Sequence, residues 1–451
     1  MIVCHARSIS FLLLIVGVVL QLIIIPYRTS FWSRSPIHTI NSLRAEERPL
    51  TRTQSIAHNE RIPSWLIEYF SWHKEMRLNF PDRQLFEHPD APKVLVRVCV
   101  WQCGGLNDRL SGLPLDIYIA NSSRRILLIK WTFPHNLEEF MVPNSINWTV
   151  PSGVGLDGNK EIKLIPQFAY HRGGGPGMLE AMAQVCTGDL ATKKVVRSSC
   201  LAGDGEVAYL QESPVFGYIF HSLFQPSPPV QAKMNHISKA YNLVHGLYTA
   251  VHCRIRHPKG VPRCQGLVGR EGGPADRSGL SFQQNFTRGR CNPNEKGLLV
   301  GSYKDFAVTI ATHAMDCAHY ISPESVVAIY FMSDSNDTVA AMIGQDSPFA
   351  GSGVAIASSY SAFEVTLHID RQHSPNVSDY YGVFVDLFLA SQAQCVSYGI
   401  GNYGIMATKI SGTNCTIQHR SFLWETGEIP GSRNGSQCPP SPHRKKHHQV
   451  R

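Results

Sequence analysis

The stretch Lys93–Leu110 reads KVLVRVCVWQCGGLNDRL and decides the fold class of the chain. Its first part, Lys93–Val100, is largely apolar, which is typical of a strand buried on both faces of a sheet. The glycines Gly104 and Gly105 predict a tight turn, a helix is expected after it, and a second apolar strand follows at Ile126–Ile129. Strand, turn, helix and strand in this order predict the start of a parallel α/β layer.

Strands and helices continue to alternate outward from this stretch. Aromatic residues within Pro63–Arg83 predict an amphipathic helix that packs onto the first strand. In the second half we expect strands at Leu247–Cys253, Val326–Met332, near Gly353–Ala357 and at Cys395–Tyr398, and helices at Tyr241–Gly246, Lys304–His319, Tyr381–Ala390 and Asn402–Ser411. The sequence therefore predicts two α/β units, with a boundary near Pro226–Pro229.

The composition is that of a folded protein of about two domains. The chain has 451 residues, of which 43% are hydrophobic and 17% charged, and this excludes a disordered or fibrous protein. The formal net charge is +8, but basic residues in 1–35 and in the last nine positions supply most of it. Because the body is nearly neutral, no nucleic-acid partner is expected.

The N-terminus predicts a membrane anchor. Residues 9–25 carry no charge and end before Pro26, without a small-residue cleavage site, which favours an uncleaved anchor over a cleaved signal peptide. A signal peptide stays the alternative. The predicted organisation is a cytoplasmic tail (1–8), a transmembrane signal-anchor (9–25), a stem (26–62), a first α/β domain (63–230), a second α/β domain (231–425) and a basic disordered tail (426–451).

Cysteines and glycosylation sequons indicate a lumenal body. Of the 12 cysteines only Cys4 precedes the anchor, so several disulfides are expected in an oxidising compartment, with at least one cysteine left over. Asn-x-Ser/Thr sequons occur at Asn121, Asn147, Asn285, Asn336, Asn376, Asn414 and Asn434. The sequence therefore predicts a glycosylated, single-pass type II membrane protein of the Golgi or ER.

Three predicted strand ends carry glycine or polar residues, and parallel α/β sheets bind ligands at such ends. The first is the turn at Gly104. Here Gly105 allows close backbone approach, while Asn107 and Arg109 offer side chains to a sugar or phosphate. The alternative is a purely structural turn in which Arg109 pairs with Asp108 or with another residue nearby.

The second strand end carries His252, Arg254 and Arg256. Side chains two apart on a strand share a face, so the three are expected to point the same way. A guanidinium binds phosphate in bidentate fashion and keeps its charge, which suits the stabilisation of a diphosphate leaving group. The alternative is a salt-bridge network at a surface strand end.

The third strand end, Gly399–Gly404, reads GIGNYG and lies between a predicted strand and a predicted helix, next to Ser397. Its letters satisfy the dinucleotide-binding fingerprint, but too few residues follow it for the remaining strands of such a fold. An NAD or FAD enzyme is therefore not expected. The glycines Gly399, Gly401 and Gly404 still predict backbone N–H groups at a helix start, which suit a phosphate.

Together these motifs resemble the GDP-fucose-dependent fucosyltransferases of the α-1,2/α-1,6/protein-O-fucosyltransferase group. The likeness covers roughly residues 93–420 and consists of short spaced motifs: Gly-Gly-Leu-x-Asp-Arg-Leu, His-x-Arg, Ser-Asp-Ser and the late glycine loop. The resemblance implies a GT-B fold, with two Rossmann-like domains across a cleft and a nucleotide sugar bound mainly by the second. It also implies inverting transfer of fucose to a glycan or protein hydroxyl, without a metal or other cofactor.

By this resemblance Arg254 neutralises the β-phosphate as the bond between sugar and phosphate breaks. The donor-binding residues that the resemblance implies are Gly105, Asn107, Arg109, His252, Arg256, Asp334, Ser335, Ser397, Gly399, Gly401 and Gly404. The chain departs from the pattern at Ile255, where many relatives carry a second arginine, and in its late loop, which lacks a Ser/Thr pair. These departures concern the identity of the donor more than the fold.

Two other functions stay open: a GT-B transferase with another nucleotide sugar, and a non-catalytic single-pass binding protein that retains the fold. Retention of Arg254 favours an enzyme. Asp334 and Asp337 have no neighbouring histidine or glutamate to complete a metal site, so none is expected. The candidates for a catalytic base, which the sequence does not rank, are Glu364, Asp370 and Asp386.

Overall fold

The computed structural model describes residues 62–99, 103–154, 163–164, 195–198, 208–254, 303–359, 369, 374–399, 401–419 and 438. The predicted anchor and stem, Arg256, Asn285, Asn434, Glu364 and Asp370 lie outside these residues. Within the described part of the chain, no helix is both long enough and apolar enough to cross a membrane.

The first sheet is parallel and forms around the stretch that the sequence singled out. Its strands are β1 (Lys93–Cys99), β2 (Arg125–Trp131), β4 (Lys163–Leu164) and β5 (Val195–Ser198), in the order β2-β1-β5-β4. The accompanying helices are α3 (Ser64–Asn79), α4 (Gln84–Glu87), α5 (Leu106–Leu110) and α6 (Leu113–Ser122). Val94, Leu95 and Val96 are all fully buried, so β1 is covered on both faces, as its apolar sequence predicts.

The second sheet is also parallel and has the strand order of a Rossmann fold. Its strands are β7 (Tyr248–Cys253), β8 (Ala328–Ser333), β9 (Ala355–Ala357), β10 (Cys395–Tyr398) and β11 (Thr416–Gln418). They lie in the order β11-β10-β7-β8-β9, so the chain builds outward from β7 to β9 and then returns to the other side of β7. The strand order therefore reverses between β7 and β10, and such a reversal is where ligands bind in open α/β sheets.

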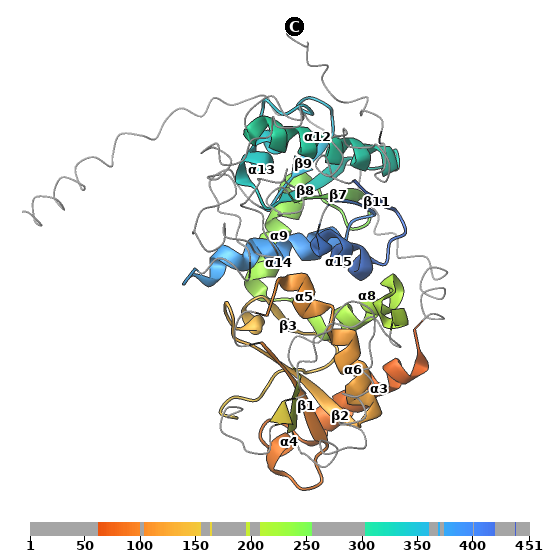
Figure 1. Ribbon diagram of the computed structural model, residues 1–451, viewed down its shortest axis with the longest axis vertical. Helices are drawn as coiled ribbons and strands as arrows, with labels where there is room; N and C mark the ends of the chain where they lie inside the picture. Colours follow the sequence, from red (N-terminus) through yellow and green to blue (C-terminus); the bar gives the residue numbers. More distant parts are fainter. Residues whose placement is uncertain are drawn as a thin grey trace, which may run out of the picture. The chain divides into compact units, whose positions relative to one another are not determined.

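Helices cover both faces of the second sheet (Figure 1). On one face, Val251 and Phe331 pack in an apolar cluster with residues of α12 (Tyr303–Ile321) and α13 (Asn336–Ile343). On the other, Ala250 and Tyr330 pack in a cluster with residues of α9 (Pro228–Tyr241), α14 (Tyr381–Ser391) and α15 (Asn402–Ser411). Alternate residues of β7 and β8 thus pack on opposite faces of the sheet, which accounts for the largely apolar sequences of both strands.

One apolar cluster continues from the first predicted domain into the second. Several short elements contribute to this cluster: the antiparallel pair β3 (Met141–Pro143) and β6 (Phe224–Pro226), the helix α8 (Ser213–Leu223), and the 3-10 turns η1 (Leu137–Glu139), η2 (Ala208–Gln211) and η5 (Val377–Tyr380). Phe140 stacks on Phe384 of α14, with ring centroids 4.4 Å apart. A Cβ on Gly217 of α8 would lie 2.6 Å from the carbonyl oxygen of Ile410, so α8 and α15 approach closely because residue 217 is glycine.

The predicted alternation of strands and helices is confirmed, with one error. The segment Tyr241–Gly246 is not a helix, because α9 ends at Tyr241 and Asn242 adopts the left-handed conformation (φ 53°). Asparagine tolerates that conformation better than most residues and commonly ends helices. The prolines at 228 and 229 occupy the first positions of α9, where a proline costs no hydrogen bond.

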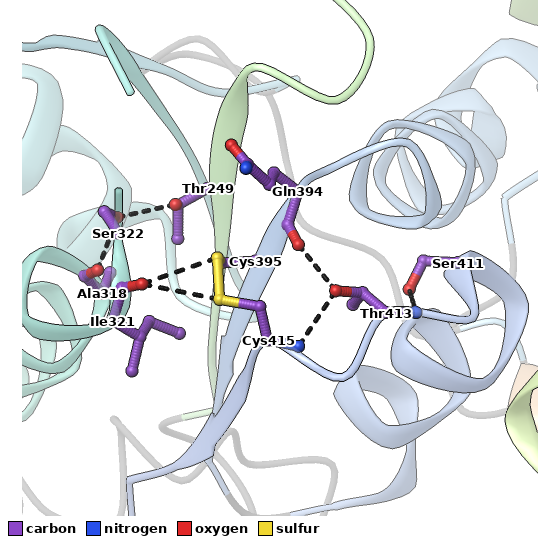
Figure 2. Close-up of a disulfide and its surroundings, with 9 residues drawn as sticks. All are labelled: Thr249, Ala318, Ile321, Ser322, Gln394, Cys395, Ser411, Thr413 and Cys415. Carbon is purple, nitrogen blue, oxygen red and sulfur yellow. Dashed lines mark hydrogen bonds between the residues drawn. A yellow bond between two sulfur atoms is a disulfide. The ribbon is translucent and has the colours of Figure 1, made fainter. Parts of the chain in front are cut away.

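Three disulfides occur among the described residues: Cys99–Cys103, Cys317–Cys438 and Cys395–Cys415. The last joins β10 to the residue before β11 (Figure 2). Cys253 is buried and free. The prediction of several disulfides with a cysteine left over is confirmed for this part of the chain.

Candidate functional site

The second and third predicted motifs meet where the strand order of the second sheet reverses. In the parallel register of β7 and β10, His252 lies beside Tyr398, at the carboxyl ends of both strands. The backbone N–H of Gly399 donates to the carbonyl oxygen of His252 over 3.1 Å. The strand end with His252 and Arg254 therefore adjoins the glycine loop that begins at Gly399, which the sequence alone did not establish.

Arg254 crosses directly over Gly401. A Cβ on Gly401 would lie 2.7 Å from Nη1 of Arg254 and 3.1 Å from its Cδ. Gly401 also has φ +89°, a conformation that other residues rarely adopt. Both observations explain why glycine precedes α15, and they place the guanidinium at the N-terminus of that helix.

Arg254 lies within reach of solvent, beside an acidic residue. Its side chain is 18% exposed, and its Nε lies 3.8 Å from Oδ2 of Asp334, at the carboxyl end of β8. Ser335 follows, is buried, and donates its backbone N–H to Ser333 Oγ over 3.2 Å. The three neighbouring strands β10, β7 and β8 thus bring Gly401, Arg254 and Asp334 to one edge of the sheet.

The N-terminus of α15 is suited to an anion. Its first turn contains no acidic residue, and no side chain caps it within the part of the chain that the structure describes. The first N–H groups of a helix lack intrahelical partners and carry a partial positive charge. With Arg254 beside it, this helix end presents the charge and the hydrogen-bond donors that a phosphate requires.

His252 supports this helix end as a neutral ring. It is 6% exposed, and burial lowers its pKa to about 4, with the neighbouring Arg254 charge adding to the effect. Gly404 leaves room for it, because a Cβ there would lie 3.0 Å from Nδ1 of His252. Its ring also lies 5.3 Å from that of Tyr403. At neutral pH His252 is therefore a packing group and carries no charge.

The first glycine turn is built differently, and Arg109 lies inside it. Arg109 is 1% exposed and donates from Nε to the carbonyl oxygen of Gly104 over 2.9 Å and from Nη1 to that of Phe133 over 2.5 Å. The Gly105 N–H donates to the Asp108 carboxylate over 2.9 Å. Arg109 thus supports the turn from within, through its contacts with two backbone carbonyls.

The two turns are nevertheless neighbours, because α5 packs against α15. Asn107, on α5, is half-buried, and Gly105 immediately precedes this helix. Among the predicted donor residues of the first domain, Gly105 and Asn107 are therefore accessible in part, whereas Arg109 is enclosed.

Ser397 and Asp386 are both buried, which bears on their predicted roles. Ser397 is 0% exposed and donates to the carbonyl oxygen of Ala314 on α12.

Asp386, a candidate catalytic base, accepts hydrogen bonds from Tyr330 and Ser359, each over 2.5 Å, between α14 and β8. Burial raises the pKa of Asp386 from 3.8 to about 7. Because it is enclosed and already paired, Asp386 is poorly placed to take a proton from an acceptor hydroxyl.

One residue of this region escaped the sequence analysis. His419, which follows β11, contacts Ser397 and lies under Gly399. No local pattern distinguishes it, because a single histidine after a short strand is common. Its placement depends on the pairing of β11 with β10, which only the folded chain shows.

The described residues contain no group of three His, Cys, Asp or Glu side chains that could hold a metal ion. The carboxylate of Asp334 instead faces Arg254.

Four predicted glycosylation sites have described side chains. Asn147, Asn376 and Asn414 are exposed, and Asn121 is half-buried on α6. Asn147 also accepts hydrogen bonds through Oδ1 from the backbone N–H and the hydroxyl of Thr149. Three of these sequons are therefore open to an enzyme at the surface.

Comparisons with known proteins give only weak similarity. No family model matches the sequence, and no curated protein matches it significantly. Among solved structures, FUT1 of Arabidopsis thaliana in complex with GDP aligns with a TM-score of 0.42 and 12% identity, over 80% of this chain and 79% of that one.

Two further structures align at a similar level. Fucosyltransferase NodZ from Bradyrhizobium aligns with a TM-score of 0.39 and 12% identity, over 70% of this chain and 92% of that one. POFUT1 in complex with GDP-fucose aligns with a TM-score of 0.35 and 10% identity, over 72% and 97%. Similarity at this level assigns neither a family nor an activity to this chain.

Proposed function

We propose that this protein is a glycosyltransferase that binds a nucleoside diphosphate sugar at the carboxyl ends of β7 and β10. The observation that carries the proposal is the position of Arg254 over Gly401, at the uncapped N-terminus of α15 and at the reversal of strand order. A guanidinium beside a helix N-terminus matches the charge and geometry of a diphosphate. The motif resemblance makes GDP-fucose the preferred donor.

In the proposed reaction an acceptor hydroxyl of a glycan or protein attacks the anomeric carbon of the donor. The bond between that carbon and the β-phosphate oxygen breaks, the configuration inverts, and the nucleoside diphosphate leaves with the bonding electrons. Arg254 and the N–H groups of α15 stabilise the negative charge that develops on the β-phosphate. The hydroxyl proton passes to a base, for which the buried Asp386 is unsuited.

The other predicted donor contacts fit this placement in part. Asp334 and Ser335, at the end of β8, lie on the side of Arg254 away from β10, where the nucleoside is expected. The neutral ring of His252 packs against Gly404 and in this way positions the start of α15. Arg109 contributes by shaping the first turn, which packs through α5 on α15.

The proposed location is the lumen of the Golgi or ER, with residues 9–25 as a single-pass anchor. The three disulfides and the exposed sequons at Asn147, Asn376 and Asn414 support this location, since both modifications belong to the secretory path. Removal of N-glycans from the protein expressed in a secretory host should lower its apparent mass. A mass unchanged by this treatment contradicts the lumenal location.

The test of function is a donor assay with the full-length protein from a secretory host. A panel of nucleotide sugars is offered with water or glycan acceptors, and release of the nucleoside diphosphate is measured. GDP-fucose should be turned over by the wild type and not by Arg254→Ala. Turnover of a different nucleotide sugar would identify that sugar as the donor instead of GDP-fucose. Failure to bind any nucleoside diphosphate would favour the non-catalytic alternative.

A further inference from the structure

His419 is a buried histidine beneath the glycine loop of the candidate site. In the parallel register of β10 and β11, Tyr398 pairs with Gln418, and this brings His419 next to Gly399. The side chain is 1% exposed, so it does not reach a bound donor directly. Its role must therefore pass through the residues that it touches.

The ring of His419 is fixed by a chain of hydrogen bonds. Ser397 Oγ donates to the carbonyl oxygen of Ala314 over 3.1 Å, and Nδ1 of His419 lies 2.9 Å from the same Oγ. Because a hydroxyl has one hydrogen, Nδ1–H of His419 is the donor in the second contact. Burial holds the pKa of His419 well below its usual value, so the ring is neutral and Nε2 carries a lone pair.

That second nitrogen faces the loop. Nε2 of His419 has no hydrogen-bond partner among the described residues, and it lies 2.8 Å from the position of a Cβ on Gly399. Gly399 does not have a positive φ, so its requirement for glycine comes from this contact and not from its backbone. The ring thus sets how closely the backbone at Gly399 can approach β11.

The position of β11 is itself fixed at its start. The disulfide Cys395–Cys415 closes a ring of chain that contains Ser397, Gly399, Gly401 and α15 (Figure 2). Hydrogen bonds from Thr413 Oγ1 to the Gln394 carbonyl (2.7 Å) and from the Cys415 N–H to Thr413 Oγ1 (3.1 Å) lie beside it, as the same figure shows. The disulfide anchors β11 to the beginning of β10, and His419 anchors it to the end.

We propose that His419 is a positioning residue for the glycine loop: through Ser397 and Gly399 it fixes the turn that orients the N-terminus of α15. That this turn binds a diphosphate rests on the proposed function, whereas the positioning itself does not. The His419 ring is held at Nδ1 by its hydrogen bond to Ser397 and contacts Gly399 on the side of Nε2. It therefore restricts the conformation of the backbone at Gly399.

The test compares His419→Ala with His73→Ala in the full-length protein. His73 is a matched control, because it is fully buried, neutral through burial, and bonded by one ring nitrogen to the Leu127 carbonyl, far from the site in sequence. Amide hydrogen exchange is measured by mass spectrometry over residues 402–405. We expect about tenfold faster exchange there in His419→Ala, as for the loss of one buried hydrogen bond, and no local change in His73→Ala.

Two conservative variants keep the test decisive if the alanine variant does not fold. Asparagine can place an amide N–H near the position of Nδ1, whereas glutamine places it near Nε2, so His419→Asn should restore more protection than His419→Gln. Gly399→Ala should mimic His419→Ala, and the double variant should be less impaired than the two single effects predict. Equal exchange in all these variants and the wild type, or equal changes in His73→Ala, overturns the positioning role.

GDP titration of the same proteins separates the two proposals. His419→Ala should weaken GDP binding about tenfold and raise the KM for the donor, with a smaller effect on kcat. If the wild type binds no GDP, the proposed function fails, while the exchange measurements still decide the role of His419. If GDP binds equally to wild type and His419→Ala while exchange differs, the positioning role stands and the diphosphate lies elsewhere.

Discussion

The two glycine turns of this chain have similar sequences and opposite construction. The turn after β1 is closed to a ligand by its own side chains. The Asp108 carboxylate accepts the hydrogen bond of the Gly105 N–H, and the guanidinium of Arg109 donates to two backbone carbonyls. The turn after β10 is open: α15 begins without a side-chain cap, and Arg254 lies over Gly401 within reach of solvent.

The difference teaches that an arginine next to glycines is not by itself a phosphate site. What matters is whether the guanidinium is exposed to solvent and whether the helix start beside it already contains an acidic residue. In the first turn Arg109 is enclosed, and Asp108 lies in the first turn of α5. In the second turn Arg254 is 18% exposed and the first turn of α15 contains no acidic residue, and each substitution described below tests one part of this contrast.

The largest contrast is expected between the two arginines. Arg254→Ala should lower the rate of transfer by about 10²–10³, because it removes a charge that stabilises the leaving group. Its stability should change little, since the side chain is partly exposed and its ion pair is long. Arg109→Ala should instead lower the free energy of unfolding by roughly 2–4 kcal/mol, because it removes a buried side chain and two half-buried carbonyls lose their donor.

Initial rates and denaturant unfolding measured on the same preparations check this pair. Arg254→Lys serves as a control, because lysine keeps the positive charge but lacks the planar, bidentate guanidinium. Loss of transfer activity in Arg109→Ala at unchanged stability would contradict the structural role of Arg109.

The second contrast concerns two buried carboxylates and their dependence on pH. Asp116 in the first predicted domain is paired with the buried Arg97, whereas Asp386 in the second accepts hydrogen bonds from the neutral hydroxyls of Tyr330 and Ser359. Burial raises the pKa of Asp386 to about 7, so the folded state binds its proton more tightly than the unfolded state does. Its stabilising contribution is complete below about pH 4 and is lost as the pH rises to about 7.

The variant Asp386→Asn should therefore gain stability relative to wild type as the pH rises through this range, by up to about 1.4 kcal/mol per pH unit. Asp116→Asn should lose roughly 3 kcal/mol near neutral pH, because it leaves a buried arginine without its partner. Urea unfolding at pH 5 and pH 8 measures both. A pH-independent difference between wild type and Asp386→Asn would show that this carboxyl is ionised throughout.

The third contrast exchanges the glycines for alanine. Gly401→Ala forces a strained φ and drives a methyl group into Arg254, so GDP binding should weaken about tenfold. Gly104→Ala has equal strain, with φ +79° and the Cβ 2.7 Å from Asp108 Oδ2, yet it should cost about 1–2 kcal/mol of stability and leave GDP affinity unchanged. Calorimetric titration with GDP distinguishes them, and equal loss of affinity in both would make the first turn part of the donor site.

The smallest effect is expected from an exchange of charge at the two helix starts. Asn402→Asp places a carboxylate in the first turn of α15, as Asp108 does in α5, and should weaken GDP binding about threefold through repulsion. Asp108→Asn removes the charge at α5 and should cost about 0.5–1 kcal/mol of stability. Because this effect is electrostatic, raising the salt concentration should reduce it, and a difference that salt leaves unchanged argues for a steric cause.

The fold was largely predictable because its elements have strong local signals. The strands around Val94 and Val251 are largely apolar, and Cys395–Tyr398 and Asn402–Ser411 have the boundaries expected from the sequence. The false helix at Tyr241–Gly246 arose because one asparagine ends α9 by adopting a left-handed conformation.

The site was predictable only in part, because its residues meet through the pairing of distant strands. Arg254 and Gly401 could each be recognised from local patterns, but their contact depends on β10 returning to the side of β7. Arg109 looked equivalent to Arg254, because burial cannot be read from a glycine-rich turn. His419 gave no signal at all, since its neighbours come from β10 and α12.

The central claim is that a diphosphate binds at the second turn and not at the first. The most direct test is amide hydrogen exchange of the wild type with and without saturating GDP. The account predicts that GDP slows exchange at residues 401–405, at the start of α15, and leaves residues 104–110 unchanged. Slower exchange at residues 104–110 without any change at 401–405 would contradict it.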